Sequence, residues 1–330
     1  MKKGKQYAKY VSVIITYYIL HITLSVAQQL PQFSQYLIND YVMNPAIGGS
    51  KNYFEAKTNH RYQWVGIADA PRTYVFSVNG PILNKMGVGG YVYTDVTGPT
   101  RRTGGQLSYA YHFSLTDNIK LGLGTSLGVL QFAIDGQKIT GKEVGDVALS
   151  SGLQSVTVAD AAAGVHLYSD KWYLSASAPQ LFRNNIQFFS EHKNNLSRLV
   201  NHYFIMAGYR FDLNETFAIA PSALIKYVSP APIQMEPTLR VIYKDQVWLA
   251  TSYRTSLGNK VGSSLSSDAL VACLGYTFQK NLTLGYSYDV TMSNLKNYSS
   301  GTHEIMLGIR FKSRKKPSAP SMDTAPAVTQ

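Results

Sequence analysis

The chain has 330 residues, a formal net charge of +12 and one cysteine, Cys273. A single cysteine excludes an intramolecular disulfide and a cysteine-rich metal or redox centre. The basic residues are scattered apart from a cluster after position 311, and no RNA-binding motif or basic helix occurs, so we expect anionic surfaces or partners and no nucleic acid.

Residues 1–27 have the three parts of an export signal: a basic start, an apolar stretch from Val11 to Val26, and small residues up to Ala27. We therefore predict a signal peptide over 1–27, with the mature chain starting at Gln28. The alternative, a membrane anchor, is short for a span and is interrupted by polar residues. No cysteine follows the cleavage point, so no lipid anchor is expected there.

Residues 28–50 form a separate segment ahead of the first expected strand. The segment holds large apolar side chains that would be exposed in an extended arm, namely Phe33, Tyr36, Leu37 and Val42. We predict that it folds into the barrel described below as a plug or short helices, or else lies in the periplasm. Within it, Asn44-Pro45 indicates a chain reversal, with a recognition turn as the alternative.

Residues 51–312 repeat a two-residue alternation. In the run 281–290, leucine, tyrosine and valine occupy one face, and threonine, glycine, serine and aspartate occupy the other. Such strands suit lipid outside and a polar lumen inside, and a bilayer admits sheets only as closed barrels. The predicted fold class is all-β, a transmembrane antiparallel β-barrel of about 14 strands. The expected strands are 53–62, 72–80, 86–94, 103–113, 119–132, 155–168, 171–179, 200–213, 216–228, 234–244, 246–254, 269–278, 281–291 and 302–312.

Tight polar turns alternate with long connections between these strands. The long loops are expected at 133–154, 180–199, 255–268 and 292–301. This asymmetry is typical of outer-membrane barrels and places both ends of the barrel on the periplasmic, short-turn side. The tail at 313–330 is rich in proline, serine and alanine, and we expect it to be disordered in the periplasm.

Charged side chains recur on the parity opposite to the apolar face. They carry both signs, and with lipid outside they point into the lumen: Glu55, Lys57, Arg61, Lys120, Arg210, Asp212, Glu236, Arg240, Arg254, Asp289, Glu304 and Arg310. Such residues line a water channel or form a network of paired charges. An unpaired buried charge is costly, so the mixed signs favour pairing and a largely blocked lumen.

The connection at 61–72 carries Trp64 between two cations, Arg61 and Arg72. Tryptophan and arginine are frequent interface anchors, so these three residues, with Asn44 and Pro45, are candidates for partner binding. The alternative is a loop that folds into the barrel mouth and puts Trp64 in the interfacial aromatic belt. The 24 tyrosines of the chain are explained by aromatic girdles.

The sequence predicts no catalytic, cofactor or metal site. No Gly-x-Ser-x-Gly motif occurs, and the histidines at 112, 166, 202 and 303 lie on distant strands with no local nucleophile or ligand cluster. We therefore expect no enzyme activity.

An ordered set of segments resembles the PorP/SprF family of type IX secretion system outer-membrane proteins. The segments run 31–36, 44–49, 61–66, 70–73, 202–209, 221–226, 248–254, 285–289 and 303–307, and include Pro31-Gln-Phe-Ser-Gln-Tyr36, Arg61-Tyr-Gln-Trp-Val-Gly66 and Gly285-Tyr-Ser-Tyr-Asp289. The resemblance implies a Bacteroidetes-type outer membrane and a non-enzymatic role in secreting or anchoring surface proteins such as gliding or adhesion filaments. Where the family leads us to expect Gln-Leu-Asp, this chain has Gln234-Met-Glu236, which keeps the carboxylate and lengthens it.

The resulting hypothesis is an outer-membrane component of type IX secretion. Its expected partners are a secreted adhesin or its C-terminal signal domain at loops 133–154 and 180–199, other periplasmic and outer-membrane secretion components, and membrane lipid. The alternative is an outer-membrane porin or transporter that passes small solutes or hydrophobic molecules through the lumen.

Overall fold

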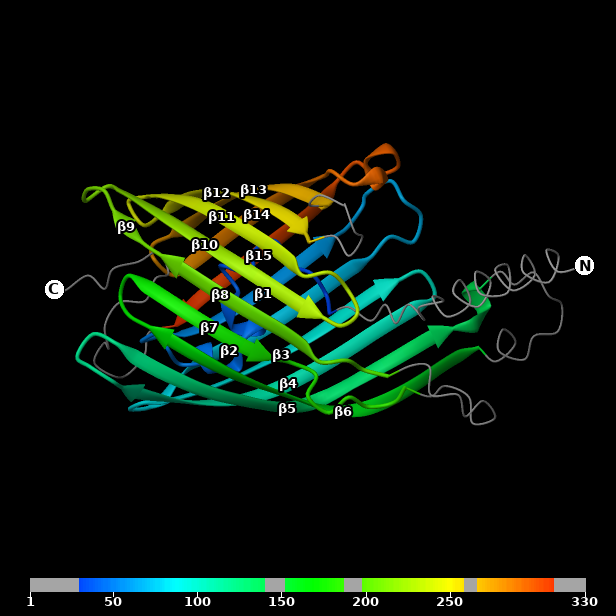
Figure 1. Cartoon of the computed structure of the whole chain (residues 1–330), viewed down its shortest axis with the longest axis horizontal. Coiled ribbons are helices and arrows are strands. Elements are labelled where there is room, and N and C mark those ends of the chain that lie inside the picture. Colours follow the sequence, from blue (N-terminus) through cyan, green and yellow to red (C-terminus); the bar gives the residue numbers. More distant parts are fainter. Residues whose placement is uncertain (1–29, 140–151, 187–197, 258–265, 312–330) are drawn as a thin grey trace, which may run out of the picture.

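The computed structural model describes residues 30–139, 152–186, 198–257 and 266–311, and its strands close into one antiparallel barrel (Figure 1). The expected signal peptide and tail lie outside the described residues. The strands are β1 (Phe54–Tyr62), β2 (Arg72–Leu83), β3 (Met86–Thr97), β4 (Thr100–Ser114), β5 (Lys120–Asp135), β6 (Leu153–Tyr168), β7 (Trp172–Ala178), β8 (His202–Tyr209), β9 (Phe211–Asp212), β10 (Phe217–Val228), β11 (Gln234–Tyr243), β12 (Val247–Ser256), β13 (Ser266–Phe278), β14 (Leu282–Thr291) and β15 (Thr302–Phe311).

Pairing of β1 with β15 closes the ring. Because β8 and β9 both pair with β10 and are separated only by Arg210, they act as one strand, so the barrel has 14 strands. The predicted fold class is confirmed. No helix in the described ranges is long and apolar enough to cross a membrane.

Several strands extend beyond their expected bounds at the long-loop end. β4 starts at Thr100 and β5 continues to Asp135, where the alternation of apolar residues has already stopped. The connection between β3 and β4 is the two-residue turn Gly98-Pro99, with Gly98 at a φ of 54°. The hydrogen-bonded ladder therefore continues past the apolar band from which the strand ends were predicted.

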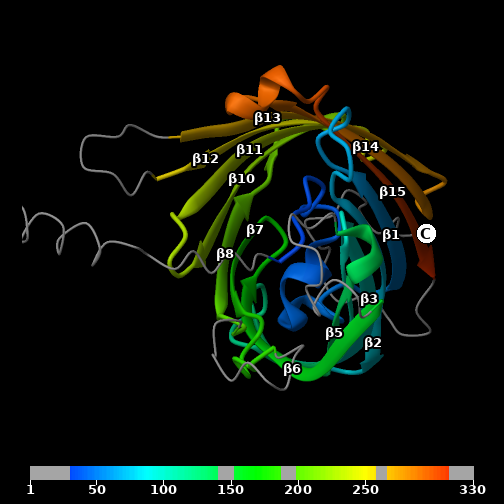
Figure 2. The same cartoon turned by 90° about the vertical axis from the view of Figure 1, so that its right-hand side faces the viewer.

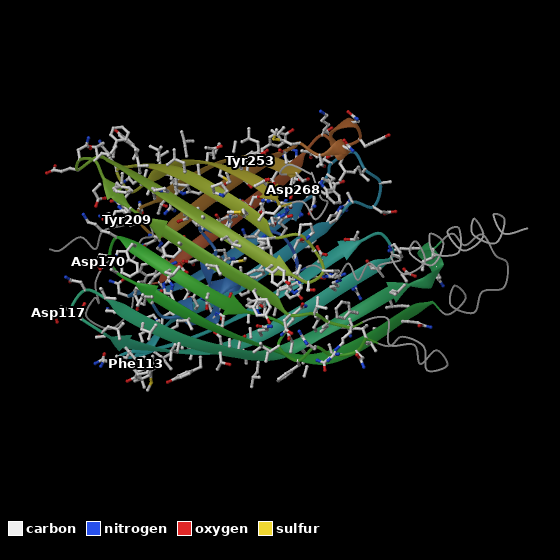
Figure 3. The ribbon with its side chains drawn as sticks, viewed as in Figure 1. Phe113, Asp117, Asp170, Tyr209, Tyr253 and Asp268 are labelled. Atoms are coloured by element: carbon white, nitrogen blue, oxygen red, sulfur yellow. The ribbon has the colours of Figure 1, made fainter. Side chains whose placement is uncertain are left out.

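The outer face of the barrel is apolar and ends in an aromatic girdle. Outward side chains such as Leu107 and Leu127 are more than 60% exposed, which suits lipid contact and would be unfavourable in water. Phe113 and Tyr209 lie near the end that carries the turn residues Asp117 and Asp170 (Figure 3). Pairs of aromatic rings in tilted or edge-to-face contact continue this girdle at the short-turn ends of the strands: Tyr209 with Phe211, Phe217 with Tyr243, and Tyr276 with Phe278.

Residues 30–50, here called the plug, lie inside the ring of strands (Figure 2). Leu30 is at the long-loop end, where its backbone N–H donates to His202 at the start of β8, and the segment then crosses the lumen to β1 at the short-turn end. Two short 3-10 helices, η1 (Asp40–Met43) and η2 (Pro45–Ile47), make it compact. The plug thus fills the lumen along most of its length.

Two apolar clusters hold the plug. In one, Tyr36 and Met43 pack with Phe204, Met206 and Leu224 of the wall. In the other, Ile38 packs with residues on the inner faces of strands between β10 and β15, including Trp248, Val271 and Met306.

Wall glycines give η2 its space. A Cβ atom at Gly124 would lie 2.3 Å from the Ala46 nitrogen, and one at Gly164 would lie 1.9 Å from the Asn44 Oδ1 atom. Both distances are shorter than any van der Waals contact, so only glycine lets the plug approach these strands.

We predict that Gly164→Val destabilises the folded protein by roughly 1–3 kcal/mol, because the added side chain enters space that Asn44 occupies. Ala163→Val is the matched control, since Ala163 immediately precedes Gly164 in β6 and is exposed on the lipid face. Urea unfolding of the two variants in detergent checks this. Equal unfolding midpoints would show that the plug does not need the close approach.

Candidate functional site

Two arginines and three carboxylates, all at most 3% exposed, form a buried network in the lumen. Arg61 on β1 reaches Asp289 at 2.8 Å and Glu304 at 3.2 Å. Arg254 on β12 reaches Asp289 at 3.0 Å and Glu236 at 2.8 Å. These pairs join β1, β11, β12, β14 and β15 across the closure of the barrel, and every charge of the network has an opposite charge beside it.

Ser34 of the plug sits at the centre of this network. Its hydroxyl accepts hydrogen bonds from Arg61 at 2.7 Å and Arg254 at 3.1 Å, and it donates to Asp289 at 2.7 Å. Its backbone N–H donates to Glu304 at 2.7 Å. Asn59 donates a further bond of 2.9 Å to Glu304. Ser34 of the plug therefore forms hydrogen bonds with both arginines and with two of the three carboxylates.

A second group of charges fixes the other end of the plug. Lys51 lies 3.2 Å from Asp40 and 3.1 Å from Glu55, and Lys57 lies 2.8 Å from Glu55. Lys57 also donates to the carbonyl oxygen of Ile38. Since Glu55 and Lys57 belong to β1 and the other groups belong to the plug or its link to β1, these bonds tie the segment to the wall.

Arg210 and Asp212 lie apart from the lumen network in which the alternation placed them. The strand is interrupted at Arg210, and Asp212 is 40% exposed at the short-turn rim. There Arg210 reaches Asp212 at 2.6 Å and Asp245 at 2.8 Å, and Lys171 lies 3.5 Å from Asp212. These rim charges connect three successive short turns.

The remaining charged residues lie elsewhere on the wall. Arg240 is buried and lines a small cavity beside Tyr36 and Lys51. Arg310 is half-buried, with its guanidinium 5.1 Å from the ring centre of Tyr53. Lys120 is half-buried at the start of β5.

Asn44 and Pro45 do not lie at the barrel mouth. Asn44 is fully buried, donates to the carbonyl oxygens of Val165 and Ala176, and accepts from the Ala46 N–H at 2.9 Å. It caps η2, with Pro45 as the first helical residue. The structure favours the chain reversal over the recognition turn, because both residues are enclosed by the wall.

At the mouth of the barrel, Trp64 and Arg72 have different surroundings. Trp64 has a φ of 50°, and its backbone N–H donates to the Thr302 hydroxyl at 3.1 Å. Its side chain lines a cavity. The next residue, Val65, exchanges backbone bonds with the β14–β15 connection at Ser300 and Gly301. Arg72 is exposed and stacks over Tyr62 at 4.7 Å. Arg61, in contrast, points inward to the buried network.

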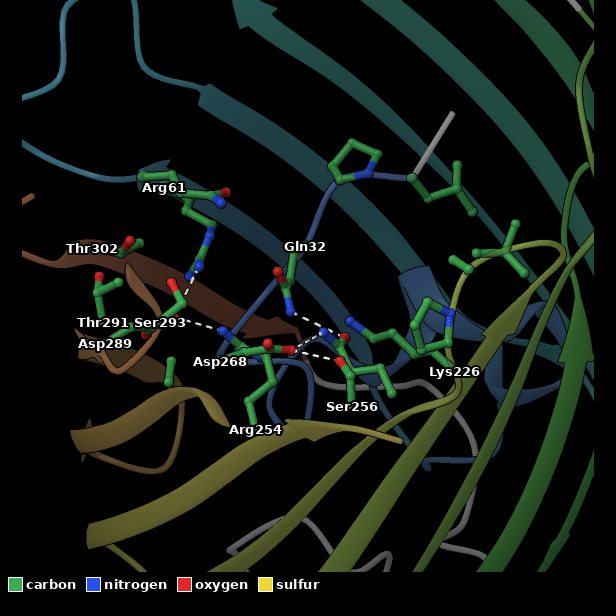
Figure 4. A pocket seen from close by; sticks show the side chains of 18 of the residues that line it. Gln32, Arg61, Lys226, Arg254, Ser256, Asp268, Asp289, Thr291, Ser293 and Thr302 are labelled. Atoms are coloured by element: carbon green, nitrogen blue, oxygen red, sulfur yellow. Dashed lines mark hydrogen bonds and ion pairs between the residues drawn. The ribbon is translucent and has the colours of Figure 1, made fainter. Parts of the chain in front are cut away.

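The cavity at the long-loop end has a volume of about 380 Å³, within the range of ligand pockets (Figure 4). Arg61, Arg254 and Asp289 of the buried network belong to its lining. The plug contributes Leu30, Pro31 and Gln32, and the wall adds, among others, Lys226, Gln234, Ser256 and Asp268. In the described residues, no group of three or more histidine, cysteine, aspartate or glutamate side chains is arranged to hold a metal ion.

Sequence reasoning missed the inward position of Lys226. On β10 the lumen-facing residues include Leu224, which is buried against the plug, so apolar residues occur on both faces and the parity signal is lost. The alternation of Lys226 with the exposed Tyr227 was the one local sign of its direction.

The lipid-facing girdle, the closed ring and the polar lumen define an outer-membrane β-barrel protein. The family model described as "Type IX secretion system membrane protein PorP/SprF" matches residues 25–309. The chain belongs to this family and is a membrane component of type IX secretion. No curated protein matches it.

Among the solved structures that are similar to this chain, one shares the fold at a TM-score above 0.5. The CymD monoaromatic hydrocarbon channel is 12% identical, with 87% of this chain and 94% of that chain covered and a TM-score of 0.51. A Pseudomonas aeruginosa FadL homologue is 11% identical, with 88% and 96% covered and a TM-score of 0.46. At 12% identity the likeness to the CymD channel concerns the barrel architecture alone.

We predict that Arg254→Met lowers the free energy of unfolding by about 3–5 kcal/mol, because Glu236 and Asp289 lose a buried cation. Arg72→Met, which removes an exposed arginine, is the control and should change stability little. Denaturant unfolding in detergent measures both. Equal effects of the two substitutions would contradict the importance of the network.

Proposed function

We propose that this protein serves type IX secretion as a non-enzymatic component that binds an exported surface protein with its long-loop end and helps to secrete or anchor it. The exported partner would be an adhesin or its C-terminal signal domain, as in gliding or adhesion. The observation that carries the proposal is the occupied lumen: the plug is joined to the wall by the Ser34 bonds and by Lys51 and Lys57. A barrel filled in this way is better suited to recognition at its ends than to conduction.

The two ends differ in what they offer. The long-loop end carries the cavity and the connections at 136–152, 179–201 and 257–265. The short-turn end carries the rim charges, namely Lys171, Arg210, Asp212 and Asp245. We assign the exported protein to the first end and other secretion components to the second, with the second end in the periplasm. Rim charges are suited to steering and orienting such a partner.

The exported partner should co-purify with a tagged full-length chain from outer membranes in mild detergent. Removal of residues 140–151 and 187–197 should abolish its recovery, because those connections stand at the proposed binding end. Mass spectrometry identifies the bound proteins, and heat-dependent gel migration confirms that the barrel is folded. Replacement of the short turn at Asp117 and Asn118 by two glycines is the control. Undiminished recovery after loop removal would refute the assignment.

Planar-bilayer recording tests the occupied lumen against the porin alternative. The whole protein should give little steady current, because the plug spans the lumen. Deletion of residues 30–50 should give large stable steps. Large steps from the unmodified protein would favour a channel for small solutes or hydrophobic molecules.

A further inference from the structure

We propose that the cavity at the long-loop end binds an extended peptide segment that carries a carboxylate, with Lys226 as its cationic anchor. This inference rests on the proposed function and specifies the site at which the exported chain is recognised. The carboxylate comes from a chain terminus or from an acidic side chain.

Lys226 is the cation of this cavity for which no hydrogen bond or ion pair is found in the described ranges. Its side chain points into the cavity, and its amino group has no hydrogen bond or ion pair there (Figure 4). The other two cations of the lining, Arg61 and Arg254, already hold carboxylates at 2.8–3.2 Å. An incoming anion would therefore gain the most electrostatic stabilisation at Lys226, because both arginines already hold carboxylates. In a confined site an ion pair of this kind is strong.

Asp268 makes a peptide a better occupant than a phosphate. Its Oδ2 atom accepts hydrogen bonds from Gln234 at 3.2 Å and from Ser256 at 2.8 Å, and no bond is found to Oδ1 in the described residues. The cavity thus offers a cation and, separately, an anionic acceptor. A peptide can place a carboxylate at Lys226 and a backbone N–H at Asp268, whereas a phosphate dianion would be repelled by Asp268.

The remaining lining suits an extended backbone. Gln32 and Gln234, joined by a 3.2 Å bond, have amide groups that can donate and accept. Apolar contact is available from Leu30, Pro232 and Leu295. The volume of about 380 Å³ admits a few residues of an extended chain and no folded domain.

Calorimetric titration of the purified full-length protein in detergent tests the inference. The probes are N-acetylated Ala-Leu-Ala with a free carboxylate, the same peptide as its carboxamide, N-acetylated Ala-Glu-Ala carboxamide, and inorganic phosphate. We expect at least one carboxylate peptide to bind about tenfold more tightly than the uncharged peptide, and phosphate not to compete. The first probe reports a terminal carboxylate and the third an acidic side chain.

Lys226→Met should remove this tenfold preference, and Lys226→Arg should keep it. Lys120→Met is the matched control, because Lys120 lies at the opposite end of the barrel and does not line the cavity. Absence of binding by both carboxylate peptides, or a preference that survives Lys226→Met, would overturn the inference. Competition by phosphate would replace it with a general anion site.

Co-purification separates this inference from the proposed function. Under the inference, Lys226→Met lowers recovery of the exported partner and Lys120→Met does not. If Lys226→Met recovers the partner in full, the peptide site is wrong and the binding role of the long-loop end stands. If the unmodified protein recovers no exported partner, the proposed function fails whatever the peptides show.

Discussion

The pairing of buried charge around Ser34 is the constraint on which the lumen depends. A barrel of this strand number is too wide for its own side chains to fill, and a polar interior without water needs partners for every charge. Arg61 and Arg254 bring positive charge to a group of three carboxylates, and Ser34 bonds to both arginines and to Asp289. The wall and the plug therefore stabilise each other, because each satisfies polar groups of the other.

The inner surface of the wall is complementary to the plug in shape as well as in charge. Glycines on β5 and β6 leave room for Asn44 and Ala46, and neighbouring polar groups such as Ser177 bond to the plug backbone. Elsewhere the inner face is apolar, where Leu224 meets Tyr36. An inner surface that combines glycine, apolar and charged areas cannot be satisfied by water alone, and it matches one particular folded segment.

The strands were predictable because lipid imposes a period of two along each of them. That period located all 14 strands within a few residues, and it placed charges such as Glu236, Asp289 and Glu304 on one side of the wall. It failed at Arg210, where the strand is interrupted, and at Lys226, where the plug makes the inner face apolar. Register and the partners of each charge depend on contacts across the whole barrel, so the central position of Ser34 could not be read from local pattern.

The plug connects the two ends of the barrel within one short segment. Its first described residues, Leu30 and Gln32, line the long-loop cavity, and its last residues lead to β1 at the short-turn end. No described strand ladder includes residues 30–50, so side chains and turns hold them in place. Binding of a partner at one end of the barrel can affect the other end only if some element of the protein has two arrangements, and the partner binds one of them more tightly. The plug lies inside the ring of strands and is held there by side-chain bonds, separately from the backbone hydrogen bonds that close the barrel.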